Sequence, residues 1–140
     1  QVDGLKGDHK KQLKTLTEIL TLPHTKSEEA VVDRALLDWT SLQKDKLEIL
    51  RRLEHRLKEH SGSKLVRLAL SQIYLDDKLD DQAAELISRG LDMEPDDPAL
   101  LARMGTALKA QGLNDLANSY FERALRENPR SQEARRGLAR

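Results

Sequence analysis

The N-terminal part of the chain carries two apolar stripes at helical spacing, separated by a short polar segment. The first stripe follows Asp8, a candidate N-cap, and stops before Pro23, while the second follows Thr25-x-x-Glu28, which has the sequence of a capping box. The stripes consist of Leu13, Leu16, Ile19 and Leu20, and then of Val32, Ala35, Leu36, Trp39 and Leu42. We predict a helix at about residues 8–22 and a second helix from residue 27.

The apolar register slips at residues 43–45 and then resumes, which predicts a turn and a further helix packed back on its predecessor. The resumed stripe consists of Leu47, Leu50, Leu53 and Leu57. Gly62 is expected to end this helix in the left-handed conformation, and Ser63 to cap the next one. A single unbroken helix over residues 27–60 is the alternative.

Two helical hairpins are predicted further along, each with turn residues at its ends. The first pairs a helix at about residues 64–76 with one at about 80–93, where two aspartates begin the second helix at the positive end of its dipole. In the second hairpin we expect Asp97 as N-cap, Pro98 as first helical residue, Gly112 at the helix end and Asn114 as N-cap of the partner helix.

The two hairpins repeat at a fixed offset, which Pro95 and Pro129 define (129 − 95 = 34). Other positions that share this offset match in size: Leu70 with Met104, Ser71 with Gly105, Tyr74 with Leu108, Ala83 with Ala117, Ile87 with Phe121, Gly90 with Ala124 and Leu91 with Leu125. Such a period is typical of units that bury their apolar faces only by stacking on their neighbours. The repeat indicates a scaffold and argues against a catalytic pocket.

The repeated positions also resemble a known family. The motifs are Arg67-x2-Leu70-Ser71-x2-Tyr74, Ala83-x3-Ile87 and Pro95, and then Leu101-x2-Met104-Gly105-x2-Leu108, Ala117-x3-Phe121 and Pro129. This pattern resembles the tetratricopeptide repeat, and the first copy departs from it at Ser71, where glycine is usual, and at Gly90, where alanine is usual. The resemblance implies an all-α, right-handed superhelical stack of antiparallel helix pairs, with about seven helices.

The resemblance covers residues 64–131 and divides the chain into units. We expect an N-terminal helix and linker at residues 1–26, a degenerate hairpin at 27–63, one repeat at 64–97, a second at 98–131, and the start of a truncated further helix at 132–140.

The composition limits the chemistry that this chain can perform. The sequence has 34% charged residues, 3% aromatic residues and no cysteine, so it offers no disulfide, thiolate nucleophile or cysteine-bound zinc. The formal net charge is +0, but residues 61–97 are acidic and residues 98–140 are basic. No apolar run approaches the roughly 18 residues of a membrane span, so no direct membrane insertion is expected.

Motifs for catalysis and ligand binding are absent from the sequence. No nucleophile elbow, phosphate loop or dinucleotide fingerprint occurs, so we expect no enzyme, no cofactor and no metal site. His55 and His60 point about 500° apart around a helix, which disfavours joint metal ligation. The acidic run at residues 76–81 lacks the spacing of a calcium loop, and the C-terminal arginines lack the interleaved aromatics typical of nucleic-acid binding.

The family resemblance also implies where a partner binds, since the first helix of each tetratricopeptide pair lines a concave face. On this sequence the expected partner-binding residues are Leu65, Leu68, Gln72, Leu75, Asp76, Ala102, Thr106, Lys109 and Arg136. The acidic end of this face is apolar, which suits an amphipathic partner helix held by leucine anchors. The alternative is that the chain's own helix at residues 8–22 fills the groove.

We therefore expect a non-catalytic protein–protein interaction scaffold that binds a partner helix or peptide within a larger assembly. Because the chain begins at Gln1, we expect a fragment of a longer protein, and tethering to a membrane through an upstream segment is a hypothesis. The expected location is cytoplasmic, with a periplasmic location left open, and no nucleic-acid partner is expected. The alternative function is structural self-assembly into a homo-oligomer, in which the acidic repeat meets the basic end of another copy.

Overall fold

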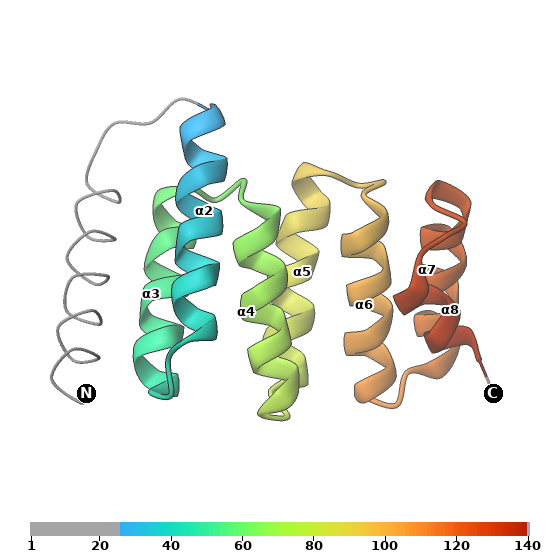
Figure 1. Ribbon diagram of the computed structural model, residues 1–140. Coiled ribbons are helices and arrows are strands. Elements are labelled where there is room, and N and C mark those ends of the chain that lie inside the picture. Colours follow the sequence, from blue (N-terminus) through green and yellow to red (C-terminus); the bar gives the residue numbers. More distant parts are fainter. Residues whose placement is uncertain (1–25, 140) are drawn as a thin grey trace, which may run out of the picture. The chain divides into compact units, whose positions relative to one another are not determined.

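The computed structural model describes residues 26–139, and these residues form a series of helices (Figure 1). The helices are α2 (Lys26–Ser41), α3 (Lys46–Glu59), α4 (Lys64–Asp76), α5 (Asp80–Met93), α6 (Pro98–Ala110), α7 (Asn114–Glu127) and α8 (Gln132–Leu138). With these seven helices and no strand in the described range, the all-α prediction is confirmed. The predicted helix at residues 8–22 and the capping threonine Thr25 lie outside the described residues.

Two compact units make up the chain, and they divide between Val66 and Arg67. The described part of the first unit contains α2, α3 and the first turn of α4. The second unit contains the rest of α4 and all of α5 to α8. Within the second unit α6 packs against α5, α7 and α8, and α7 also packs against α8.

α2 and α3 are separate helices, so the alternative of one helix over residues 27–60 is wrong. Asp45 caps α3, because its side chain accepts a hydrogen bond from the N–H of Glu48 at 3.3 Å. The predicted role of Gly62 is also wrong: α3 ends at Glu59, and among the described glycines only Gly112 has a positive φ. Ser63 caps α4 as predicted, accepting from the N–H of Val66 at 3.2 Å.

The starts of the helices keep the repeat period from α3 onward. α3, α5 and α7 begin at residues 46, 80 and 114, and α4, α6 and α8 begin at residues 64, 98 and 132. The N-caps of α4, α6 and α8 follow the same period. The side chains that accept their capping hydrogen bonds belong to Ser63, Asp97 and Ser131. Of the first hairpin only α3 follows this period, because α2 begins at residue 26 and not at residue 30 (64 − 34 = 30).

The turns after α4 and α6 share one backbone conformation. In each, one residue adopts the left-handed region, Lys78 with φ 61° and Gly112 with φ 83°. The following N–H then reaches back to a helix carbonyl, from Leu79 to Tyr74 at 2.8 Å in the first turn. This geometry leaves Asn114 as the first residue of α7, so its predicted role as N-cap is wrong: the N-cap is Leu113, which makes no side-chain capping bond.

Lys78→Gly is expected to stabilise the protein by about 0.5–1 kcal/mol. Glycine removes the Cβ clash of the left-handed conformation, and the extra backbone entropy that glycine loses on folding is smaller than this gain. Urea unfolding followed by circular dichroism measures the change. Lys78→Ala is the matched control, since it removes the same charge and keeps the Cβ. An equal gain from the alanine variant would assign the effect to charge and contradict the conformational explanation.

One pair of facing positions is filled differently in successive hairpins. In the last hairpin Leu101 of α6 and Ala124 of α7 belong to a single apolar cluster. One repeat earlier the pair is Arg67 and Gly90, where a Cβ on the glycine would lie 2.6 Å from the arginine Cδ. Arg67 is buried and donates through Nη1 to the carbonyl of Leu86 at 2.9 Å. Burial, and secondarily the charge of Arg89, lowers the pKa of Arg67.

In the first hairpin the same pair is ionic. Asp33 of α2 accepts from Nε of Arg56 of α3 at 2.9 Å, and both side chains are buried, 4% and 1% exposed. Arg56 also pairs with Glu29, and Ser63 donates its hydroxyl to Asp33 at 2.6 Å. The cap of α4 is thereby bonded to the buried carboxylate of α2, and an ion pair replaces an apolar contact inside this unit.

Phe121 of α7 is the central large side chain of the second unit and is fully buried. Its ring lies against two glycines: a Cβ on Gly105 of α6 would be 2.5 Å from it, and a Cβ on Gly137 of α8 would be 2.2 Å from it. Both contacts are closer than real Cβ atoms allow, so glycine is required at each place for the ring to fit. The small residue that the repeat pattern has at position 105 is explained by this close approach.

Candidate partner-binding cleft

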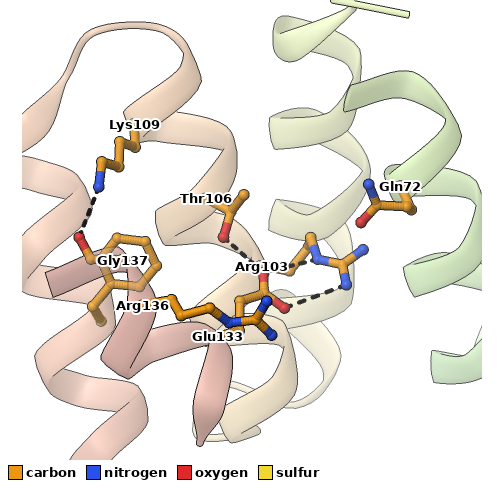
Figure 2. Close-up of a pocket in the computed structure, with 8 residues that line it drawn as sticks. Gln72, Arg103, Thr106, Lys109, Glu133, Arg136 and Gly137 are labelled. Atoms are coloured by element: carbon orange, nitrogen blue, oxygen red, sulfur yellow. Dashed lines mark hydrogen bonds and ion pairs between the residues drawn. The ribbon is translucent and has the colours of Figure 1, made fainter. Parts of the chain in front are cut away.

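A cleft of about 400 Å³ opens in the second unit beside α6 and α8 (Figure 2). Its walls come from the first helices of three successive hairpins, α4, α6 and α8, and its floor from α7. The lining residues are Gln72, Arg103, Thr106, Lys109, Phe121, Glu133, Arg136 and Gly137. This is the face that the family resemblance assigns to a partner.

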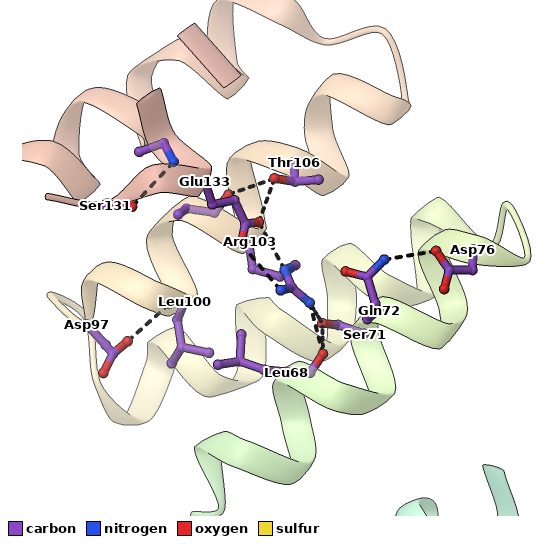
Figure 3. A network of polar contacts seen from close by, with 12 residues as sticks. Leu68, Ser71, Gln72, Asp76, Asp97, Leu100, Arg103, Thr106, Ser131 and Glu133 are labelled. Carbon is purple, nitrogen blue, oxygen red and sulfur yellow. Dashed lines mark hydrogen bonds and ion pairs between the residues drawn. The ribbon is translucent and has the colours of Figure 1, made fainter. Parts of the chain in front are cut away.

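Arg103 connects the three helices that line the cleft (Figure 3). Its guanidinium donates to both oxygens of Glu133 on α8, from Nε at 3.0 Å and from Nη2 at 3.3 Å. In the other direction Nη1 donates to the carbonyl of Leu68 at 2.9 Å and to the hydroxyl of Ser71 at 3.0 Å. A two-point arginine–carboxylate contact fixes direction as well as distance, so this residue sets the spacing of the cleft walls.

The carboxylate of Glu133 is held from two sides, which leaves it little freedom to bind anything else. Besides Arg103, Thr106 donates its hydroxyl to Glu133 Oε2 at 2.7 Å (Figures 2 and 3). The residue lies in the first turn of α8, whose cap Ser131 accepts from the N–H of Ala134 at 3.3 Å. Local capping thus begins α8 where Glu133 can reach α6.

Two cations at the rim of the cleft have no carboxylate partner in the described part of the chain. Lys109 is exposed and donates from Nζ to the carbonyl of Gly137 at 2.9 Å, which leaves its other N–H groups open to solvent. Arg136 lies beside Glu133 in the cleft (Figure 2), and it is exposed, with no ion pair to any residue in 26–139. With Arg103 and Glu133 offsetting each other, the rim carries a net positive charge.

The structure brings several of the sequence-predicted partner residues together in this cleft, namely Gln72, Thr106, Lys109 and Arg136. Gln72 is exposed and donates from Nε2 to Asp76 at 2.9 Å, so the predicted Asp76 lies one turn further along α4. The rim of the cleft they form is basic, whereas the leucine anchors were expected at the acidic end of the face, and those anchors do not line the cleft.

The remaining predicted residues differ in exposure. Ala102 is 1% exposed and belongs to the core cluster around Phe121, so the prediction that its side chain meets a partner is corrected. Leu68 and Leu75 are half-buried. Leu75 packs against a cluster formed by Ala83 and Ala84 of α5 and Ala107 of α6. Leu65 is 38% exposed and belongs to the first unit.

Sequence reasoning missed Arg103 as a partner-face residue, and the reason is the repeat itself. One period earlier the same position is Ala69 and one period later it is Gly137, so comparison of the copies gives no signal there. A different signal was present: Arg103 is the one charged residue in α6 before Lys109, in a helix that is otherwise apolar or small. A charge there needs a partner, and Glu133 supplies it.

Neither histidine of the described chain takes part in a metal-binding group, and residues 26–139 contain no cluster of ligands that could hold a metal ion. His55 pairs with Glu59 at the surface, and His60 lies 3.1 Å from Glu29 beside the buried arginine. No helix among the described residues is long and apolar enough to cross a membrane.

Comparison with known sequences supports the repeat resemblance. The tetratricopeptide repeat family model matches residues 98–140, which include α6, α7 and α8 and most of the cleft lining. This part of the chain is therefore similar to a tetratricopeptide repeat. Tetratricopeptide repeats support a protein-interaction scaffold as the class of function, and such folds are typically non-catalytic. No curated protein matches the sequence significantly.

Solved structures with a similar fold include several of MamA. MamA AMB-1 in the P212121 crystal form is 19% identical, with a TM-score of 0.62 over 91% of this chain and 70% of that chain. MamA MSR-1 in the C2 form is 17% identical, with a TM-score of 0.59 over 91% of this chain and 74% of that one. At this identity the likeness shows the fold alone, which is all-helical and tetratricopeptide-like.

Proposed function

We propose that the cleft of α4, α6 and α8 binds an acidic peptide or helix of a partner protein. The observation that carries the proposal is the gathering of Gln72, Thr106, Lys109 and Arg136, predicted from the repeat register, around one cleft of about 400 Å³. The protein is then a non-catalytic scaffold whose second unit holds the partner segment.

The charges of the rim support an acidic segment in particular. Lys109 and Arg136 project at the cleft without carboxylate partners in the described chain, so a ligand carboxylate would meet two cations there. Two exposed cations side by side attract an acidic partner over about 10 Å at ordinary ionic strength. This attraction favours the encounter as well as the bound state. Gln72 adds an amide that can exchange its bond with Asp76 for one to a peptide backbone.

Selection of random peptides on the wild-type chain tests the proposal, and acid-containing sequences are expected to be enriched. Binding of a selected peptide, measured by fluorescence anisotropy, should fall at least about tenfold, or 1.4 kcal/mol, in Lys109→Glu/Arg136→Glu. The loss should shrink at high salt because the contacts are exposed.

The matched control is Arg126→Glu/Arg130→Glu, which reverses two exposed cations of the same unit that do not line the cleft. This control should retain most of the affinity, because only general attraction is reduced. Equal losses in the two double variants, or enrichment of basic peptides, would contradict binding at the cleft.

We further propose that this scaffold works within a larger assembly and that the protein is tethered to a membrane. The support for an assembly is the protein-binding character of the repeat family. Fractionation of cells that express the full-length protein, followed by immunodetection with and without a high-salt wash, tests the tether. Recovery of all the protein in the soluble fraction would reject it.

A further inference from the structure

Three hydrogen-bond donors of α6 converge on one carboxylate inside the cleft of the second unit (Figure 3). Arg103 offers Nε and Nη2 to the two oxygens of Glu133, at 3.0 Å and 3.3 Å, and Thr106 adds its hydroxyl to Oε2 at 2.7 Å. We call Arg103 and Thr106 the carboxylate seat. A guanidinium fork and a hydroxyl bind any carboxylate in the same way, so the seat is not specific for the glutamate that fills it.

The carboxylate seat is held in place without the help of Glu133. Nη1 of Arg103 donates to the carbonyl of Leu68 at 2.9 Å and to the hydroxyl of Ser71 at 3.0 Å, both on α4. The hydroxyl of Thr106 has a second acceptor one turn back on its own helix, at 3.1 Å. Because α4 fixes one edge of the guanidinium, the other edge stays directed into the cleft when the glutamate leaves.

Glu133 is held less firmly than the seat that it fills. Its side chain is 31% exposed, against 15% for Arg103, and it belongs to the first turn of the seven-residue helix α8. Within residues 26–139 its carboxylate bonds only to the carboxylate seat. An incoming carboxylate replaces like with like: the seat keeps its hydrogen bonds, and the released glutamate regains solvation and rotamer freedom.

We propose that the carboxylate seat binds an acidic side chain of the partner, which displaces Glu133 from Arg103 and Thr106. This inference rests on the proposed function, since the displacing carboxylate belongs to the segment that the cleft binds. Lys109 and Arg136 attract that segment at the exposed rim, and the less exposed seat then receives one of its carboxylates. Glu133 is therefore an internal competitor, which fills the seat in the free protein and disfavours segments that have no acid to replace it.

Removal of the competitor is expected to strengthen binding of the partner. In the full chain, Glu133→Ala should bind a selected acidic peptide about tenfold more tightly than the wild type, because the seat no longer has to be vacated. The peptide carries an amidated C-terminus, so that every carboxylate belongs to a side chain. In the Arg103→Met background the same substitution should change the affinity by no more than about threefold. Gains of equal size in both backgrounds would assign the effect to the general field of the cleft and overturn the exchange.

Acetate tests the carboxylate seat without any peptide. Glu133→Ala removes a methylene and a carboxylate, which are the heavy atoms of acetate, so this ion fits the vacated place. Acetate should raise the thermal midpoint of Glu133→Ala by about 3 °C or more relative to chloride at equal ionic strength. The wild type should not respond, and neither should Glu127→Ala, which removes an exposed carboxylate outside the cleft lining. An equal response of all three proteins would overturn the seat as a binding site.

The two experiments separate failure of the exchange from failure of the proposed function. A wild type that binds the acidic peptide, with no gain in Glu133→Ala, would keep the function and overturn the exchange. A protein that responds to acetate but selects no acidic peptide would overturn the proposed function, and with it the displacement of Glu133 by a partner. If the alanine variant does not fold, Glu133→Gln keeps the length of the side chain and removes its charge, and a peptide affinity unchanged from the wild type would then overturn the exchange.

Discussion

Replacing Phe121 with alanine is expected to destabilise the second unit by about 3–5 kcal/mol, the usual range for removal of a buried aromatic side chain. The ring is fully buried and fills the space between Gly105 and Gly137. Neither glycine has a side chain that could move into the cavity, so relaxation would recover little of the loss. We expect this to be among the largest single effects in residues 67–140.

The measurement is urea unfolding followed by circular dichroism, with Leu116→Ala on the same helix as control. Leu116 is 50% exposed, so its truncation should change the unfolding free energy by no more than about 0.5 kcal/mol. The cleft should respond as well, because Phe121 forms its floor and contacts α8 through Gly137. A Phe121→Ala protein as stable as the control would show that the buried ring does not stabilise this unit.

Arg56→Ala is expected to destabilise the first unit by about 3–5 kcal/mol, because it leaves a buried carboxylate without its cation. Asp33 would keep only the hydroxyl of Ser63 and its contact with His60, and Glu29 would lose its ion pair with Arg56. The cost arises from the charge that stays behind, since the favourable part of a buried ion pair is largely offset by desolvation.

The double variant Asp33→Leu/Arg56→Ala distinguishes this explanation from a simple loss of packing. It copies the pair found in the last hairpin, Leu101 with Ala124, and should recover most of the stability lost by Arg56→Ala alone. Thermal unfolding of the wild type, both single variants and the double variant completes the cycle. A double variant less stable than either single variant would mean that the ion pair itself contributes the stability.

The helices and their order follow from the sequence because apolar periodicity and capping residues act locally. Ser63 and Asp97 were predicted as caps from their position before an apolar stripe, and both accept the expected backbone hydrogen bonds. Gly62 and Asn114 were misassigned because residue type alone favoured them. The chain instead places Lys78 and Gly112 in the left-handed conformation, and the N–H after each then closes the preceding helix.

The candidate site was only partly predictable, since it depends on contacts between residues far apart in the chain. The repeat register located Gln72, Thr106 and Lys109 on one face, because equivalent helices present equivalent positions. It could not reveal that Arg103 joins Leu68 to Glu133, because such a bond depends on side chains that differ from copy to copy. Whether the cleft binds a partner, and whether copies of the chain assemble head to tail, stay predictions.

The ionic pair in the first hairpin determines how this chain tolerates recombination. Exchange of one helix between hairpins would set Asp33 opposite Gly90 or Ala124, and would bury a lone carboxylate in either case. Transfer of α2 and α3 together keeps Asp33 with Arg56, just as transfer of α4 with α5 keeps Arg67 with its glycine. The hairpin, and not the single helix, is therefore the smallest module by which evolution or engineering can lengthen or shuffle this protein.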